Sequence, residues 1–370
     1  MSTIKANAIL DASGGNTVTI NSVTPTAYNT MGKNRIINGA MEIDQRNAGA
    51  SVAASNASTV TYTLDRWPYY ADVSSKFTVQ QNAGSVTPPV GFVNYLGVTS
   101  SSAYSVGASE RFVIQHRIEG LNIADLAWGT ASAKTITISF WIRSSLTGTF
   151  GGALRNSAAN RSYPFTYTIS SANTWEQKSI TIAGDTTGTW LTTNGNGIII
   201  SIGLGVGSTY SGTAGSWVAG NYQSATGATS VVGTNGATLY ITGVQLEVGS
   251  VATEFERRPY GTELALCYRY YQYYNNSERV PAWVGPGTST HVLTANVLKV
   301  PMRAAPTVSL SGAASFDAYF LSTYTQSSAG IIRNTGSTDC VVLIYPNFTG
   351  LPSNAAGAIT IATTSISAEL

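Results

Sequence analysis

Apolar and polar residues alternate with a period of two along much of this chain. In TITISFWIRS (135–144) isoleucine or phenylalanine stands at every second position, and the same pattern recurs in ERFVIQHRIEG (110–120), SYPFTYTIS (162–170) and IIISIGLGV (198–206). Such alternation is typical of half-buried antiparallel strands. Clusters of Gly, Ser, Asn and Thr separate the stretches and predict turns.

Helical periodicity is confined to residues 121–128 and 261–271. In the second of these, Thr262 is placed to cap a short helix that runs through Cys267. Many short strands with glycine-rich turns favour an all-β fold. We expect a jelly-roll β-sandwich, then a short helical turn, then a second and smaller β-sandwich.

One strand shows a change of parity. In TLYITGVQLEVG (238–249), Leu239 and Ile241 share one parity, whereas Val244, Leu246 and Val248 have the other. A continuous strand keeps both sets on one face only if it slips by one residue at Thr242–Gly243. The pattern therefore predicts a β-bulge with glycine at the special position.

The pattern divides the chain into four parts. A short polar N-terminal segment (1–33) precedes the large jelly-roll module (34–258). A connector with the short helix (259–275) then leads to a smaller C-terminal β module (276–370). Because no repeat of fixed period is visible, a solenoid is not expected.

Composition narrows the functional class. Charged residues make up 10% of the chain and the net charge is +2, so no electrostatic footprint for nucleic acid is present. No signal peptide or membrane-spanning run is visible, and we expect no membrane insertion. A weakly charged surface rich in Ser, Thr, Asn and Gly suits extracellular or virion proteins. The two cysteines, Cys267 and Cys340, make no framework on their own, and the sequence leaves their pairing open.

No catalytic or cofactor motif is apparent. The two histidines, His116 and His291, lack metal-ligand spacing, and His116 falls on the apolar parity of its strand. We therefore expect no enzyme activity, no metal and no cofactor. GDTTG (184–188) is read as a turn rather than a calcium loop, since one carboxylate is too few. Six carboxylates leave a glycan-hydrolysing pair open, although their spacing favours none: Asp65, Asp72, Glu110, Glu119, Asp125 and Asp185.

Sugar binding is the better chemical hypothesis. A pyranose stacks its C–H face on an exposed aromatic ring, while its hydroxyls bond to polar side chains. Trp141 stands on the polar parity of its strand, and Trp217 lies in a Gly/Ser-rich loop. The alternative for each is packing, under a neighbouring loop or subunit for Trp141 and as a loop anchor for Trp217. The candidate glycan-binding residues are Trp141, Trp217, Asn221, Tyr222 and Trp283, the last in an expected loop.

Residues 244–274 combine charges, a cysteine and tyrosines. We interpret this stretch as a joint between domains or subunits rather than as a ligand site, because tyrosine offers apolar area with a polar tip. The candidate joint residues are Arg257, Arg258, Tyr260, Tyr268, Tyr270, Tyr271 and Tyr273. In LDRW (64–67), Trp67 is expected in the core, with Asp65 and Arg66 as a local pair.

Several motifs resemble those of phage tail fibres and related virion structural proteins. They are NRIINGAMEIDQRNAG (34–49), YTLDRW (62–67), GDTTGTW (184–190), LYITGVQLEVGSVATEFERRPYGTELALCYRYYQ (239–272) and VPMRAAPTVSL (300–310). The middle module is similar to jelly-roll carbohydrate-binding modules. The resemblance implies a virion-attachment role for residues 1–33.

The same resemblance implies a function. It suggests a tail fibre or receptor-binding subunit that recognises host surface glycan during adsorption, located in the virion tail. Other tail or baseplate proteins would be its partners, and a homotrimer its assembly. Two alternatives remain open: a purely structural virion component (baseplate, collar or capsid decoration) and a glycan depolymerase.

Overall fold

The computed structural model describes most of the chain. The described residues are 32–56, 60–274, 279–284, 291–311, 314–318, 322–326, 333–336, 338, 340–352, 355–360 and 363–370. All but the last two residues of the expected N-terminal segment therefore lie outside the described residues.

Strands dominate the described part of the chain, where the strand pairs are antiparallel except for β12 and β14, which run parallel. The strands are β1 (Val52–Ala53), β2 (Thr61–Leu64), β3 (Trp67–Ala71), β4 (Phe77–Gln81), β5 (Leu96–Ser100), β6 (Arg111–Glu119), β7 (Ile136–Ser144), β8 (Gly148–Arg155), β9 (Arg161–Ile169), β10 (Glu176–Ile182), β11 (Asn196–Val206), β12 (Ser211–Gly212), β13 (Val218–Ala219), β14 (Ser224–Ala225), β15 (Thr238–Val248), β16 (Tyr271–Tyr274), β17 (Arg279–Val284), β18 (Val292–Val297), β19 (Thr307–Ser311), β20 (Ser315–Ala318), β21 (Ser322–Thr325), β22 (Arg333–Gly336), β23 (Cys340–Tyr345), β24 (Ala356–Thr360) and β25 (Thr363–Ser367). The helices are α2 (Tyr260–Tyr268) and the 3₁₀ turns η1 (Ala83–Ser85), η2 (Gly120–Asn122), η3 (Ala124–Leu126) and η4 (Ser208–Tyr210).

The chain forms two compact units that are not divided at a single point. The first contains the described residues up to Glu42 and those within Gly49–Thr61 and Pro68–Arg258. The second contains Pro259–Leu370 and two short upstream segments, Ile43–Ala48 and Tyr62–Trp67. The two upstream segments belong to the second unit, whereas the expected division placed both inside the large module.

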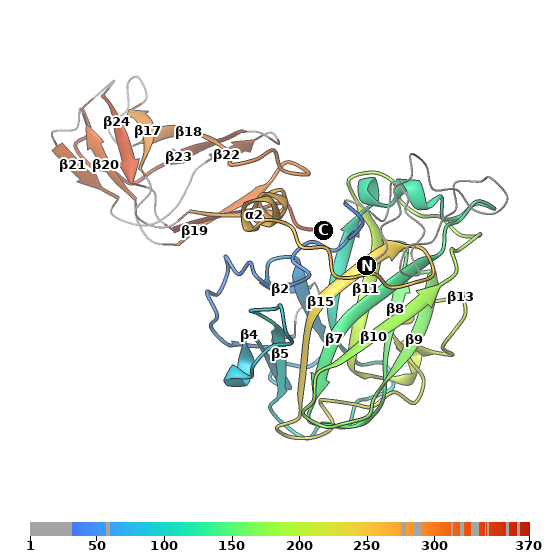
Figure 1. Ribbon diagram of the computed structural model, residues 1–370. Helices are drawn as coiled ribbons and strands as arrows, with labels where there is room; N and C mark the ends of the chain where they lie inside the picture. The colour runs from blue at the N-terminus through green and yellow to red at the C-terminus, as the bar shows by residue number, and fades with distance from the viewer. Residues whose placement is uncertain are drawn as a thin grey trace, which may run out of the picture. The chain divides into compact units, whose positions relative to one another are not determined.

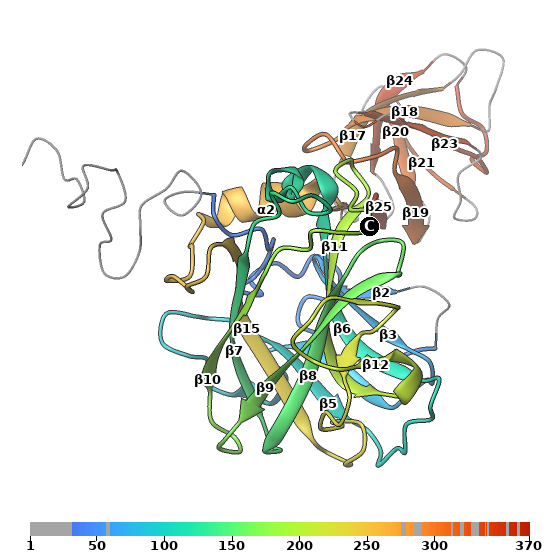
Figure 2. The ribbon, with the colours of Figure 1, turned by 90° about the vertical axis from the view of Figure 1, so that its right-hand side faces the viewer.

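The first unit is a jelly-roll β-sandwich, as expected from the period-two pattern (Figure 1). One sheet has the order β1-β4-β5-β15-β7-β10 and the other has the order β13-β9-β8-β11-β6-β3-β2. Figure 2 shows strands of both layers from the side on which β9 and β10 lie. The inward parity of the strands fills the core, where Tyr167 of β9 meets Phe140 of β7 and Phe150 of β8 at ring-centroid distances of 5.3 and 5.8 Å.

The predicted bulge in β15 is confirmed. Thr242 pairs with Trp141 and Gln245 with Ser139, so two residues of β15 lie opposite a single residue of β7. Gly243 adopts φ = 60° there, which glycine tolerates without the steric penalty of a β-carbon. The slip keeps Leu239 and Leu246 fully buried on opposite sides of the bulge.

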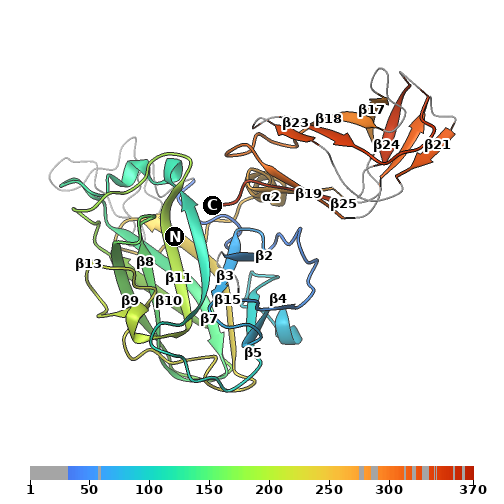
Figure 3. The ribbon, with the colours of Figure 1, turned by 180° about the vertical axis from the view of Figure 1, so that it is seen from behind.

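The second unit consists of a three-stranded sheet (β16-β25-β19), a seven-stranded sheet (β21-β20-β24-β17-β18-β23-β22) and α2 (Figure 3). The helix begins earlier than predicted, because the carbonyl oxygen of Pro259 accepts the N–H groups of Thr262 and Glu263 at 2.9 and 3.1 Å. Thr262 therefore lies inside the first turn and is not the N-cap. Cys267 and Cys340 form no disulfide, and burial raises the pKa of Cys267.

The two upstream segments are fixed inside the second unit by a group of residues that we call the arginine clamp: Gln45, Arg46, Asp65, Arg66, Tyr270, Tyr271 and Glu369. Glu369 forms ion pairs with both Arg46 and Arg66. The guanidinium groups stack on Tyr271 and Tyr270, respectively, each 3.6 Å from the ring centroid.

The clamp revises the expected local pair of Asp65 and Arg66. Asp65 accepts hydrogen bonds from the backbone N–H and the Nε2 of Gln45, both at 2.8 Å. Arg66 is tied to Glu369, 303 residues later. Trp67 is 1% exposed, which confirms its prediction as a core residue.

Asp65 makes the second unit sensitive to pH. Burial raises the pKa of this carboxyl to about 6, and Arg46 and the Gln45 N–H oppose the rise only in part. Because the folded-state pKa lies above the ordinary value of 3.8, the protonated carboxyl of Asp65 is favoured in the folded state. Its contribution to the unfolding free energy is complete below about pH 4 and is lost as the pH rises through 6.

We expect the unfolding free energy of the wild type, minus that of Asp65→Asn, to fall by about 3 kcal/mol between pH 4 and pH 7. Urea titrations of both proteins across that range, followed by circular dichroism, measure the difference. A difference that stays constant with pH would contradict the assignment.

Candidate functional site

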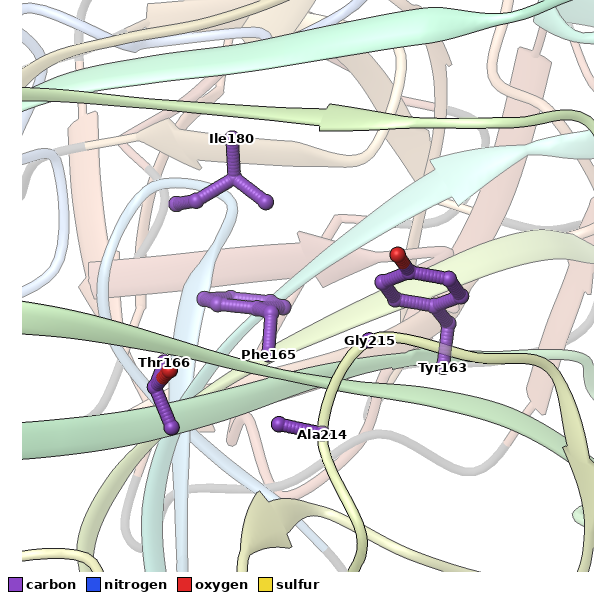
Figure 4. Close-up of a pocket in the computed structure, with 6 residues that line it drawn as sticks. All are labelled: Tyr163, Phe165, Thr166, Ile180, Ala214 and Gly215. Atoms are coloured by element: carbon purple, nitrogen blue, oxygen red, sulfur yellow. The ribbon is translucent and has the colours of Figure 1, made fainter.

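A pocket of about 240 Å³ opens in the first unit between β9 and β10. Its lining combines two rings and an aliphatic side chain, Tyr163, Phe165 and Ile180, with Thr166, Ala214 and Gly215. Figure 4 shows both rings on the side of β9 that faces Ile180, while Thr166 points to the other side. The pocket arises where β10 ends one sheet and β9 lies next to the short end strand β13 of the other.

Trp217 lies at the centre of an aromatic cluster that includes Tyr163 of this pocket. Trp217 lies with its ring centroid 5.2 Å from Tyr163, 5.2 Å from Trp128 and 5.3 Å from Trp190. We call Tyr163, Trp128, Trp190 and Trp217 the tryptophan cluster. Trp128 and Trp190 are each 7% exposed, whereas Trp217 and Tyr163 are half-buried. These two rings are thus the members of the cluster with surface left for a ligand.

The loop that carries Trp217 is held at both ends. The indole Nε1–H donates to the carbonyl oxygen of Ala183, just after β10, at 2.7 Å. Gly215 N–H donates to Pro164 O at 2.9 Å, and Val218 of β13 pairs with Ser162 of β9. Trp217 therefore has a fixed orientation, which limits the entropy lost when a ligand stacks on it.

Asp185 holds the tryptophan cluster in place through a hydrogen bond to Trp190. It is 1% exposed and accepts hydrogen bonds from Arg161 Nε and Nη2 at 2.9 and 2.6 Å. Trp190 Nε1–H also donates to it, at 3.2 Å. Burial pushes the pKa of Asp185 up, but the Arg161 hydrogen bonds and charge outweigh burial, so the pKa lies below its ordinary value. The GDTTG segment is a turn organised by this carboxylate, whose Oδ1 also accepts the N–H of Thr187 at 3.2 Å.

Asn221 and Tyr222 share the loop with Trp217. The backbone N–H of Tyr222 donates to Ser162 Oγ at 3.1 Å, which fixes this part of the loop beside β9. The Tyr222 ring fills the space at two glycines, since a β-carbon on Gly212 or Gly220 would lie 2.8 Å from it. Asn221 and Tyr222 are both half-buried. The structure thus brings three of the five predicted glycan-binding residues onto one loop.

Trp141 lies on the other sheet and is not part of this site. It is half-buried beside Gly243, where a β-carbon would lie 3.2 Å from Trp141 and 2.6 Å from Phe92. Phe92 in turn contacts Phe255, with ring centroids 5.2 Å apart. This geometry matches the packing alternative for Trp141.

Trp283 belongs to the second unit. Its side chain is 41% exposed, so it has surface available for a partner. The expected loop is wrong, however: Trp283 lies in β17, where it pairs with Leu293 of β18 and Ala356 of β24.

The predicted joint residues have contacts within their own units. In the first unit, Arg257 stacks over Phe92 at 4.6 Å, and Arg258 donates to Ile36 O at 3.1 Å. In the second unit, Tyr270 and Tyr271 belong to the arginine clamp, while Tyr260 is 60% exposed. Lys299 Nζ lies 5.0 Å from the Tyr268 ring centroid and donates to the carbonyl oxygen of Tyr273 at 3.0 Å. Their role as a joint stays a prediction.

The pocket itself was missed from the sequence. Tyr163 and Phe165 stand on the inward parity of SYPFTYTIS, which is the pattern of core residues, and the same is true of Ile180 beside Ile182. Only the sheet order reveals that β9 and β10 meet at an open edge of the sandwich. The tryptophan cluster is likewise scattered over 90 positions of sequence.

Most of the carboxylates considered for hydrolysis have defined structural partners. Asp125 pairs with Arg35 at 2.7 Å, Asp72 accepts the N–H of Arg111 at 2.8 Å and Glu110 accepts that of Gly107 at 2.8 Å. Across the described ranges, no three His, Cys, Asp or Glu side chains converge to hold a metal ion. None of the helices in the described part of the chain has the length and apolarity needed to cross a bilayer.

Comparison with known proteins finds likeness in structure but not in sequence. No protein-family model and no curated protein matches the chain. A putative sugar-binding protein from Bacteroides thetaiotaomicron is 11% identical, with a TM-score of 0.34 over 59% of this chain and 100% of its own. A family 4 carbohydrate-binding module is 14% identical, with a TM-score of 0.28 over 58% of this chain and 99% of its own.

A third similar structure is the enzymatically active domain of bacteriophage CBA120 tailspike protein 4. It is 10% identical, with a TM-score of 0.29, and the match covers 58% of this chain but only 21% of the tailspike chain. The structures similar to this chain thus include carbohydrate-binding modules and a phage tailspike domain, and the first unit is itself an all-β jelly-roll sandwich.

Proposed function

We propose that the protein binds a sugar ring of a host surface glycan in the pocket between β9 and β10. The single observation that carries this proposal is the half-buried ring of Trp217, held in place next to a pocket that Tyr163 and Phe165 line. A volume of about 240 Å³ lies just below the range of roughly 300–1,000 Å³ usual for larger ligands, and it suits one sugar unit.

The groups around the pocket match the two needs of a pyranose. Its C–H face can stack on Trp217 or Phe165, and its hydroxyls can bond to the phenol hydroxyl of Tyr163. Because the tryptophan cluster and Asp185 hold the rings in place, binding requires little rearrangement. The function that we propose is binding without catalysis.

We further propose that this protein is a tail fibre or other receptor-binding subunit of a phage particle, present as a homotrimer with tail or baseplate proteins. The support is the resemblance of residues 34–49, 62–67 and 239–272 to the motifs of such fibres. All three motifs contribute residues to the arginine clamp, which gives them a shared structural role.

The test of the pocket is a glycan array probed with the full chain, followed by titration of the best glycan. Trp217→Ala is expected to weaken binding about tenfold, the loss of roughly 1.4 kcal/mol of stacking. Trp141→Ala is the matched control, since Trp141 lies on the other sheet. Its affinity is expected to equal that of the wild type.

A second variant separates binding from folding. Ala214 is exposed and lines the pocket, so Ala214→Trp fills the cavity without removing a core contact, and it is expected to abolish binding. Wild-type affinity in both Ala214→Trp and Trp217→Ala, or an array without any bound glycan, would overturn the proposal.

A second candidate function is a purely structural virion role. It is favoured by Val90 and Val93, which are 101% and 74% exposed in one loop and offer apolar contacts to a neighbouring protein. Labelling the chain in an intact particle distinguishes the two: a distal position favours receptor binding, and an internal one favours the structural role.

A further inference from the structure

Two arginines stand in one row on the outer face of the seven-stranded sheet of the first unit. Arg117 of β6 pairs with Ile199 of β11, and Ile199 also pairs with Arg155 of β8. Residues directly opposite in antiparallel strands share a face, and neighbouring strands lie about 4.8 Å apart. The side chains of Arg117 and Arg155 therefore project from the same face of the sheet, on either side of Ile199, and both are half-buried.

Arg155 lacks a counter-charge among the residues that the structure describes. Within the described ranges, its side chain makes no hydrogen bond or ion pair, and its Nε is buried. Burial, together with the charges of Arg117 and Arg111, lowers the pKa of Arg155 to about 10. The group is still charged at neutral pH, so the fold retains a partly buried cation that is costly without an anion.

A buried amide donor lies in the same region. Arg117 Nη2 donates to Gln115 Oε1, which directs Gln115 Nε2 to Ser201 Oγ and Gln223 Oε1, each contact being 3.3 Å. The Nε2 of Gln223 is left without an acceptor among the residues described, although this side chain is only 1% exposed. Leaving a buried donor unsatisfied costs about 1–3 kcal/mol.

The loop that carries Gln223 is fastened to this face. A β-carbon on Gly151 or Gly203 would lie 2.5 or 2.8 Å from Ser224 Oγ, so the two glycines allow the loop to sit directly on the sheet. Ser162, which pairs with Arg155, donates its hydroxyl to Gly220 O at 2.5 Å. Residues 220–224 are thus held beside Arg155 by the fold itself.

We propose that Arg155, Arg117 and Gln223 form a binding site for an oxyanion, the carboxylate of an acidic sugar. A guanidinium fork matches a carboxylate with two parallel hydrogen bonds, and the Gln223 amide supplies a further donor. Arg111 is excluded from the site because Asp72, Tyr70 and Tyr210 already surround its guanidinium. That the anion is carried by a sugar rests on the proposed function, whereas the oxyanion chemistry stands without it.

The experiment is calorimetric titration of the full chain with trigalacturonate, neutral galactotriose and inorganic phosphate. Trigalacturonate is expected to bind at least tenfold more tightly than galactotriose, and Arg155→Gln is expected to weaken its binding at least tenfold. Because Arg155 holds no ion pair, this variant is expected to fold. Arg143→Gln, on the other sheet, is the matched control and is expected to leave the affinity unchanged.

Each other outcome decides against the inference. Equal affinity for the acidic and neutral sugars, or unchanged binding in Arg155→Gln, overturns the site. Phosphate that binds as tightly as trigalacturonate overturns its assignment to a sugar.

The pocket variants separate this inference from the proposed function. Trigalacturonate binding that Arg155→Gln removes and Ala214→Trp leaves intact supports the oxyanion site while the pocket fails. In the opposite case, Ala214→Trp alone removes galactotriose binding and the protein shows no preference for the acidic sugar. That outcome supports the pocket and contradicts the oxyanion site.

Discussion

Glu369→Ala is expected to lower the unfolding free energy of the second unit by about 3–5 kcal/mol. Glu369 is the shared carboxylate of Arg46 and Arg66, and the Arg66 side chain is 1% exposed. Burial acts to lower the pKa of Arg66, but Glu369 outweighs it and holds the pKa above its ordinary value. Removing the carboxylate leaves two cations in a poorly hydrated site, and this accounts for the size of the loss.

Denaturant unfolding, with hydrogen exchange read over residues 259–370, measures the effect of Glu369→Ala. The matched control is Glu254→Ala, an exposed glutamate of the first unit, for which we expect less than about 0.5 kcal/mol. If the ion pair is responsible, combining Glu369→Ala with Arg66→Met recovers part of the stability. A loss below about 1 kcal/mol in Glu369→Ala would rule out the clamp as a main source of stability.

Asp185→Ala is expected to destabilise the first unit by about 3 kcal/mol or more and to loosen the tryptophan cluster. The carboxylate is buried and holds Arg161, Thr187 and Trp190 together, so its loss removes several charge-assisted hydrogen bonds at once. Trp190 then loses its acceptor at 3.2 Å and retains the longer 3.4 Å contact to Thr187 O, so the ring that supports Trp217 is held less firmly.

Thermal unfolding, together with tryptophan fluorescence, reports both consequences of Asp185→Ala. Asp125→Ala serves as the control, because Asp125 also pairs with one arginine but is 28% exposed. Pairs of that kind contribute about 0–1 kcal/mol. Equal losses in the two variants would show that burial of Asp185 is not what matters.

The local pattern of apolar and polar residues was enough to predict the strands and the bulge, which depend on residues close together in the sequence. The alternation in TITISFWIRS predicted β7, and the parity change around Gly243 predicted the bulge of β15, because a period of two is a property of each strand alone. The all-β class follows from many such strands. Trp217, Asn221 and Tyr222 were recognised as candidates because their loop interrupts the pattern.

Contacts between distant segments could not be predicted in this way. Nothing near Arg66 in the sequence indicates that its carboxylate is Glu369, and adjacency to Asp65 suggested a different partner. The pocket depends on which strands end each sheet, so Tyr163 and Phe165 were indistinguishable from core residues. Thr262 failed as a cap because the carbonyl of Pro259 accepts the first helical N–H groups, which places the cap three residues earlier in the chain.

The arginine clamp also orders events during synthesis. Arg66 leaves the ribosome 303 residues before Glu369, an interval of about 15–60 s at usual translation rates of roughly 5–20 residues per second. The last strand of the first unit, β15, ends at Val248 and so emerges within that interval, while residues 43–48 and 62–67 still lack their partner. A nascent chain stalled before Glu369 would therefore present a folded sandwich with two unpaired arginine segments, available to a chaperone or to a neighbouring copy.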